Sequence, residues 1–236
     1  MADPARAMKR FYKDAAARPA EGGHEILLDG RPVKTPARHP LAVPSERLAA
    51  AIAQEWQAQG EKIEARSMPL TGLANAAIDR VAPDKETFAR GLALYGESDL
   101  LCYRAESPAG LVARQSELWD PPLAWARRRF DINFEVVPGI IHRPQPQNTI
   151  QQLAHAVAAR DPFELAALSP LVTIGGSLVL ALALAEGEVD LETAWAAATL
   201  DEQWQLEQWG ADAEAEKALE GRRRDFDAAY RFLQLL

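Results

Sequence analysis

The sequence predicts an α+β protein with two parts: a small N-terminal α+β domain over residues 1–83 and a larger all-helical domain over residues 84–236. Before Pro83, short alternating segments and frequent prolines are typical of short strands. After it, apolar residues recur at helical spacing almost to the C-terminus. A chain of 236 residues is long enough to give both domains a hydrophobic core.

The N-terminal part is predicted to contain a hairpin followed by two helices. Asp29-Gly30 is a strong signal for a tight hairpin turn. Ser45 is placed to cap a helix that stops at Gly60. The expected strands are residues 10–15, 24–29, 31–36 and 61–66, and the expected helices are 45–60 and 69–81.

The C-terminal part is predicted to be helical throughout. Within its third helix, residues 119–122 (Trp-Asp-Pro-Pro) indicate a stop and a turn, with Asp120 capping the segment that follows. Residues 132–143 are expected to be irregular, with a turn at Pro138-Gly139. The expected helices are 84–96, 98–105, 109–129, 146–160, 161–168, 170–185, 190–211 and 213–234.

The most apolar run, residues 171–185, is predicted to be a buried helix of a soluble protein. Its 15 residues reach about 22 Å, short of the ~30 Å hydrocarbon core of a membrane. Ser169 can cap it, with Pro170 at its first position. Gly175-Gly176 lies inside this helix, where it would allow close packing against a neighbour.

Residues 193–210 combine three tryptophans with carboxylates in one predicted helix, for which Asp190 is the expected cap. At 100° per residue, each of its two apolar faces carries a glutamate. The faces are Trp195, Thr199, Glu202, Leu206 and Trp209, and Leu200, Trp204, Glu207 and Ala211. Trp195 and Trp204 are predicted to be core residues. Glu202 and Glu207 have either a cationic partner within the chain, such as one of the C-terminal arginines, or a partner on another protein.

Charge and cysteine content narrow the class of protein. The formal net charge of −8 argues against general nucleic-acid binding, and the basic runs at 127–129 and 222–224 are interpreted as solvated helix faces. The single cysteine, Cys102, excludes a disulfide framework within the chain and is expected to be a small buried hydrophobe. The first residues lack the apolar region of a secretory signal and the character of a transit peptide.

The sequence carries no strong signature of catalysis. It has no phosphate-binding or dinucleotide-binding glycine loop, no serine nucleophile elbow and no metal-ligand spacing among its four histidines. Paired carboxylates remain open as a general acid and base. The candidates are Asp79, Asp99, Asp120, Glu202 and Glu207. Asp99 with Tyr103 and Arg104 could form a small-molecule enzyme site between the domains, or a salt bridge and helix cap.

Several segments, taken together and in order, resemble one known family. They are residues 10–13 (Arg-Phe-Tyr-Lys), 28–36 (Leu-Asp-Gly-Arg-Pro-Val-Lys-Thr-Pro), 55–56 (Glu-Trp), 68–71 (Met-Pro-Leu-Thr), 99–104 (Asp-Leu-Leu-Cys-Tyr-Arg), 119–121 (Trp-Asp-Pro) and 207–210 (Glu-Gln-Trp-Gly). In these segments the chain resembles the assembly chaperones of the ATP synthase catalytic sector that act on the alpha subunit. The resemblance covers about 200 residues, from Arg10 to Gly210.

The resemblance implies a monomeric chaperone that binds the free alpha subunit and prevents its aggregation until it pairs with beta. It implies no cofactor, metal, catalytic residue or membrane insertion. The partner-binding residues would be Glu202, Glu207, Trp209 and Gly210. Trp56, Asp99, Tyr103 and Arg104 would be structural or partner-facing. A bacterial member would act in the cytoplasm, and a processed eukaryotic member in the mitochondrial matrix.

Overall fold

A computed structural model describes residues 8–139, 141–210 and 212–236. The predicted α+β class is confirmed, with a small sheet-containing N-terminal region and a larger helical part. The described chain forms two compact units. The first unit runs to Asp84 and also takes in Pro162–Ala166 and Arg231–Leu236. The second unit comprises Lys85–Asp161 and Ala167–Tyr230.

The first unit is built on a small antiparallel sheet whose central strand is β2. Its strands are β1 (Ala15–Ala20), β2 (Gly23–Leu28), β3 (Arg31–Pro32) and β4 (Ala42–Val43). β2 pairs with each of the other three strands. Asp29 and Gly30 have φ values of 47° and 76°, which is the geometry of a type I′ hairpin turn, so the predicted hairpin is confirmed. The strand predicted at 10–15 is wrong, because β1 begins only at Ala15.

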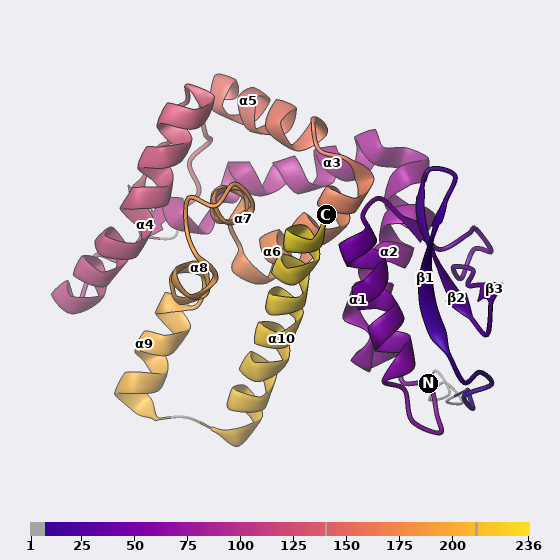
Figure 1. Cartoon of the computed structure of the whole chain (residues 1–236). Coiled ribbons are helices and arrows are strands. Elements are labelled where there is room, and N and C mark those ends of the chain that lie inside the picture. The colour runs from indigo at the N-terminus through magenta and orange to yellow at the C-terminus, as the bar shows by residue number, and fades with distance from the viewer. Residues whose placement is uncertain (1–7, 140, 211) are drawn as a thin grey trace. The chain divides into compact units, whose positions relative to one another are not determined.

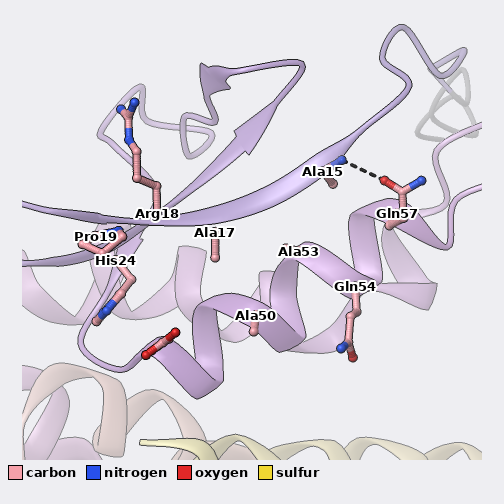
Figure 2. Close-up of a pocket in the computed structure, with 10 residues that line it drawn as sticks. Ala15, Ala17, Arg18, Pro19, His24, Ala50, Ala53, Gln54 and Gln57 are labelled. Atoms are coloured by element: carbon pink, nitrogen blue, oxygen red, sulfur yellow. Dashed lines mark hydrogen bonds between the residues drawn. The ribbon is translucent and has the colours of Figure 1, made fainter.

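Helix α1 (Glu46–Gln57) packs against β1 and β2 (Figure 1). The Ser45 Oγ atom accepts a hydrogen bond from the Leu48 N–H at 3.0 Å, so the predicted cap is confirmed. Figure 2 shows that the Ala17 side chain points from β1 toward α1, near the small side chains of Ala50 and Ala53. The Ala15 N–H donates to the Gln57 side chain at 2.8 Å and ties the two elements together.

Helix α2 (Pro69–Ala76) follows a short 3-10 turn, η1 (Ala65–Ser67). The strand predicted at 61–66 is wrong, because only Lys62 forms an isolated bridge there, with Lys9. Glu55 joins α1 to α2, because its carboxylate accepts from the Leu70 and Thr71 N–H groups at 2.8 Å each. Burial raises the pKa of Glu55, against the effect of these hydrogen bonds. After α2 the chain continues as a π-helical turn, η2 (Ala77–Val81), and a 3-10 turn, η3 (Ala82–Asp84).

Among the described residues of the second unit, the regular elements are helices and helical turns and one short parallel strand pair. Figure 1 shows the helices. Helices α6 and α10 contribute residues to both units. Its elements are α3 (Lys85–Ala93), η4 (Leu94–Ser98), η5 (Leu100–Cys102), β5 (Tyr103–Arg104), α4 (Ala109–Phe130), β6 (Val137–Pro138), α5 (Gln147–Ala158), α6 (Pro162–Gly175), α7 (Leu178–Ala185), α8 (Leu191–Ala198), α9 (Leu200–Trp209) and α10 (Ala213–Leu235). The helix predicted over 98–105 is therefore wrong.

Helix α4 runs without interruption through Pro121 and Pro122, so the predicted stop there is wrong. Trp119 is fully buried and anchors the middle of the helix. Asp120 does not cap a second segment; its carboxylate accepts a hydrogen bond from the Arg104 guanidinium at 2.7 Å.

The apolar run over 171–185 is divided between two helices, so the single helix predicted over 170–185 is wrong. Helix α6 passes through Pro170 and ends at Gly175, and Gly176 has a φ of 65°. Ser177, not Ser169, provides the cap, since its Oγ accepts from the Leu180 N–H at 2.9 Å. All residues from 178 to 184 are buried, as predicted for this run. Among the described residues, no helix has both the length and the apolar character needed to cross a membrane.

Candidate partner-binding site

The tryptophan-rich segment is two helices that meet at Thr199. The φ and ψ of Thr199 are −110° and 9°, which interrupts the single helix predicted over 190–211. Two side chains satisfy backbone carbonyls at the end of α8. The Thr199 hydroxyl donates to the Trp195 carbonyl at 2.8 Å, and the Trp119 indole N–H donates to the Ala197 carbonyl at 2.9 Å. The two predicted continuous faces are therefore wrong, and Ala211 lies outside the described residues. The predicted Asp190 cap is confirmed by its 2.8 Å hydrogen bond with the Thr193 N–H.

Glu202 and Glu207 each have a cationic partner within the chain. Arg222 of α10 donates to a Glu202 carboxylate oxygen at 2.6 Å. Arg114 of α4 donates to both Glu207 oxygens at 2.8 Å. The Glu202 side chain is 36% exposed and the Glu207 side chain 48%. Neither glutamate is buried inside the second unit, and both ion pairs are open to water.

The ion pair with Glu207 raises the pKa of Arg114, which is in any case always charged. The Arg114 guanidinium also lies over the Trp204 ring, 4.9 Å from its centroid. Trp204 packs closely on Gly110 at the start of α4, where a β-carbon would lie 2.9 Å from the indole. These contacts fix Trp204 and Glu207 against the same helix.

Trp195 and Trp204 are half buried, so the prediction that they are core residues is only partly correct. The Trp195 ring makes an edge contact with Phe226 at 5.5 Å between centroids. The Arg223 guanidinium covers the Trp195 ring at 5.4 Å. Both tryptophans therefore pack between helices of the second unit, and each side chain stays partly exposed to solvent.

Trp209 is the exposed aromatic of this surface. It is the last residue of α9 and is 79% exposed. Gly210, with a φ of 86°, ends the helix, and its N–H donates to the Leu206 carbonyl at 2.9 Å. Trp209 follows Glu202 by seven residues and so shares a face of α9 with it. An exposed indole on a face that also carries an accessible carboxylate can bury apolar area and form ion pairs with another protein. We call Glu202, Glu207 and Trp209, with Arg114 and Arg222, the α9 surface.

Asp99, Tyr103 and Arg104 do not converge on one point. Asp99 is fully buried and accepts hydrogen bonds from the Leu101 N–H at 3.1 Å and the Val179 N–H at 2.9 Å. The Tyr103 hydroxyl lies 3.0 Å from the His142 Nδ1. Arg104 pairs with Asp120, as described above, and its Nε donates to the Leu101 carbonyl at 2.9 Å. Each side chain has its own structural partners.

Cys102 is fully buried, as predicted. Burial, with the nearby Asp99 carboxylate, raises the pKa of its thiol to about 12, which makes it a poor nucleophile. In the parts of the chain that the structure describes, no three histidine, cysteine or acidic side chains are grouped so that they could hold a metal ion.

Trp56 is half buried in the first unit, where its ring makes an edge contact with Tyr12 at 5.8 Å. The Tyr12 hydroxyl donates to the Trp56 carbonyl at 2.6 Å. The Arg10 guanidinium donates to the Gln57 carbonyl at 3.2 Å and to the Gln59 carbonyl, just beyond the end of α1, at 2.5 Å. It therefore satisfies carbonyl groups at the C-terminal end of that helix. The Arg-Phe-Tyr-Lys segment therefore has a structural role at the end of α1.

Sequence reasoning missed Arg114, which is 93 residues from Glu207 and carries no local signal of that contact. It also misjudged one basic run: Arg222 pairs with Glu202 and Arg223 with Glu192, so these two side chains are not merely solvated. The other run, 127–129, is exposed, although Arg129 donates to Glu186 at 2.7 Å.

Comparison with known proteins identifies the class. The family model described as ATP12 chaperone protein matches residues 9–127. The mitochondrial protein atp12 of Schizosaccharomyces pombe is 27% identical over 220 residues, which cover 88% of this chain and 76% of that protein. The crystal structure of Atp12 from Paracoccus denitrificans is 43% identical, with a TM-score of 0.92, covering 97% of this chain and 98% of that one.

An Agrobacterium tumefaciens protein proposed to be a chaperone is 46% identical in its crystal structure, with a TM-score of 0.91 over 96% of this chain and 85% of that one. The chain therefore belongs to the ATP12 chaperone family, the assembly chaperones of the ATP synthase. It is a chaperone rather than an enzyme, and the alternative of a small-molecule enzyme is wrong.

Proposed function

We propose that this chain binds the free alpha subunit of the ATP synthase through the α9 surface and prevents its aggregation until beta takes its place. The observation that carries the proposal is Trp209, a large indole that is 79% exposed at the end of the helix that also carries Glu202 and Glu207. A free subunit exposes apolar area that is buried in the assembled complex, and such area promotes aggregation. Tryptophan is the residue type most often found at the energetic centre of a protein interface.

The charged members of the α9 surface give the proposed interface its orientation. Glu202 and Glu207 each keep a half-exposed carboxylate, held in place by an arginine. Cations of a client can share these carboxylates without the cost of burying an unpaired charge. Binding of this kind is reversible, as release to beta requires.

The proposal is tested by light scattering of isolated alpha subunit with an equimolar amount of the chain. Wild-type chain should suppress aggregation, and Trp209→Ser should suppress it much less. Ile141→Ser is the matched control, since Ile141 is also 79% exposed and lies in the same unit. Aggregation that proceeds with the wild-type chain, or equal effects of the two substitutions, contradicts the proposal.

The glutamates are tested by Glu202→Gln and Glu207→Gln. Both ion pairs are open to water, so each variant should change the melting temperature little. Weaker alpha-subunit binding at unchanged melting temperature supports a partner-facing carboxylate. A variant that unfolds instead shows that the carboxylate serves the second unit itself.

The compartment and oligomeric state belong to the same proposal. One relative is named as mitochondrial and another comes from a bacterium. We infer that the chain acts as a monomer where alpha subunits are folded, in a bacterial cytoplasm or in the mitochondrial matrix. Size-exclusion chromatography with light scattering should give the mass of one chain, 25.9 kDa.

A further inference from the structure

The first unit carries a hollow surface that the α9 surface does not include. Two hollows of about 840 and 500 Å³ adjoin each other, since both are lined by Met8, Lys34, Arg38 and Trp56. We call them together the Trp56 groove. Their size is in the range of binding sites for small molecules and peptide side chains.

The floor of the Trp56 groove is apolar. Tyr12, Ile63 and Met68 line it and belong to a buried cluster on which Trp56 packs. Met8 and Phe11 stand at its edge and are 57% and 65% exposed. Large apolar side chains exposed next to an apolar hollow are typical of a surface that another chain covers.

The rim of the groove is basic, although the chain as a whole has a net charge of −8. Arg31, Lys34 and Arg38 line it, and among the described residues no carboxylate pairs with any of them. Asp29 also lines the groove, but its oxygens accept from the Lys13 and Asp14 N–H groups at 2.9 to 3.2 Å. The rim therefore carries three cations and one carboxylate, so its net charge is positive although the chain as a whole is acidic.

The loop that presents Arg38 is held in a fixed conformation. The Asp79 carboxylate accepts from the Thr35 hydroxyl at 2.7 Å and the Ala37 N–H at 2.9 Å, and lies 2.9 Å from the His39 Nδ1. Arg38 itself has a φ of 73°, a left-handed conformation that a non-glycine residue rarely adopts. Such conformations persist only where the surrounding structure holds them, and they cluster at functional sites.

Two polar atoms of residues that line the groove lack hydrogen-bond partners within the described structure. They are the Trp56 indole Nε1 and the Asn75 side-chain oxygen, both buried. A buried donor or acceptor without a partner is costly, and an ordered water or a shift of the side chain into the groove would satisfy it.

We propose that the Trp56 groove binds an extended peptide segment in which bulky apolar side chains are flanked by aspartate or glutamate. The apolar side chains lie on the floor, and the carboxylates meet Arg31, Lys34 and Arg38. This segment belongs to the client, a point that rests on the proposed function. The groove is then a second point of contact, which adds affinity to the α9 surface by multivalency.

The test measures fluorescence anisotropy of a labelled probe peptide, Glu-Leu-Glu-Phe-Glu-Leu-Glu-Phe, with the full chain. Wild-type chain should bind it saturably. The double variant Lys34→Glu with Arg38→Glu should bind the probe about tenfold or more weakly, because the two new carboxylates repel the glutamates of the probe. The matched control is Arg143→Glu with Lys217→Glu, two exposed cations of the second unit, which should leave binding within about twofold.

Two further measurements need no substitution and hold if the double variant fails to fold. Binding to wild-type chain should weaken as salt rises from about 50 to 500 mM. A probe with lysine for glutamate, and one with serine for leucine and phenylalanine, should both fail to bind. Equal binding of the lysine probe, or no effect of the rim substitutions in a folded variant, overturns the proposal.

The remaining outcomes separate the occupant of the groove from the proposed function. Isolated alpha subunit should displace the probe, and alpha-subunit binding that leaves the probe in place overturns the assignment of the groove to the client. Probe binding that appears only after removal of residues 1–7 also overturns it, since the chain's own N-terminus is then the occupant. The probe assay contains no ATP synthase subunit, so its failure leaves the α9 proposal standing.

Discussion

The substitution Asp99→Asn measures the cost of a charge that is buried at the N-terminus of α7. The Asp99 side chain is fully buried, and its two oxygens accept from N–H groups of Leu101 and Val179. Burial raises its pKa from 3.8 to about 6, although these hydrogen bonds oppose the shift. The folded protein therefore holds the Asp99 proton more tightly than the unfolded chain does.

The sign and size of the effect follow from this difference in pKa. Protonation of Asp99 stabilises the folded state fully below about pH 4, and this contribution is lost as the pH rises through about 6. The shift corresponds to about 2 to 3 kcal/mol in the free energy of unfolding. An asparagine cannot titrate, so the wild-type protein should gain that amount relative to Asp99→Asn between pH 7 and pH 4.

The assay is urea unfolding at several pH values, followed by circular dichroism and tryptophan fluorescence for both proteins. Taking the difference between them removes the titration of all other groups. Asp14→Asn, at an exposed side chain, is the matched control. A difference that stays within about 0.5 kcal/mol from pH 7 to pH 4, or that grows in favour of asparagine, refutes the reasoning.

Three further predictions concern single contacts. Native Cys102 should react with a thiol reagent at pH 8 about 100-fold or more slowly than in the unfolded chain, because burial raises its pKa to about 12; fast native labelling would contradict this. Gly23→Ala should lower the free energy of unfolding by about 1–3 kcal/mol, since its β-carbon would lie 2.3 Å from the Val43 carbonyl oxygen; an unchanged urea midpoint would speak against it. Trp119→Phe should lower the free energy of unfolding by about 1–3 kcal/mol, because the Ala197 carbonyl loses its hydrogen bond from the indole N–H; an unaltered melting temperature in calorimetry would contradict this.

Local signals were enough to predict α1 and the first hairpin. Ser45 caps α1 through its own side chain, and Asp29-Gly30 adopts the positive φ values that its turn requires. Both features depend on residues that are neighbours in sequence. For the same reason the α+β class could be predicted from the change in pattern along the chain.

Helix breaks that depend on distant residues could not be predicted. The apolar run over 171–185 breaks at Gly176, where Ser177 and the distant Asp99 together satisfy the first N–H groups of α7. The break at Thr199 is stabilised in part by the Trp119 indole, which belongs to α4. A periodic pattern alone does not reveal such partners.

The candidate site likewise contains residues that could be predicted from the sequence and residues that only the fold brings to them. The glutamates and Trp209 are visible in the sequence as an unusual mixture on one helix. The C-terminal arginines were expected as partners of these glutamates, and Arg222 does pair with Glu202. Arg114 could not be predicted, because it pairs with Glu207 from a helix that is distant in the chain. The Trp56 groove was missed, although most of its lining residues belong to segments 10–13, 28–36, 55–56 and 68–71, which carry the family resemblance. Their spacing along the chain does not show that these segments meet around one hollow.

The most direct test of the account is to mix the purified chain with isolated alpha subunit, and then to add beta subunit, on a size-exclusion column. The account predicts that the chain and alpha elute as a complex, which Trp209→Ser weakens. Addition of beta subunit should dissociate this complex and release the free chain. If alpha and the chain elute separately at micromolar concentration, or if beta binds the chain in place of alpha, the proposed client is wrong.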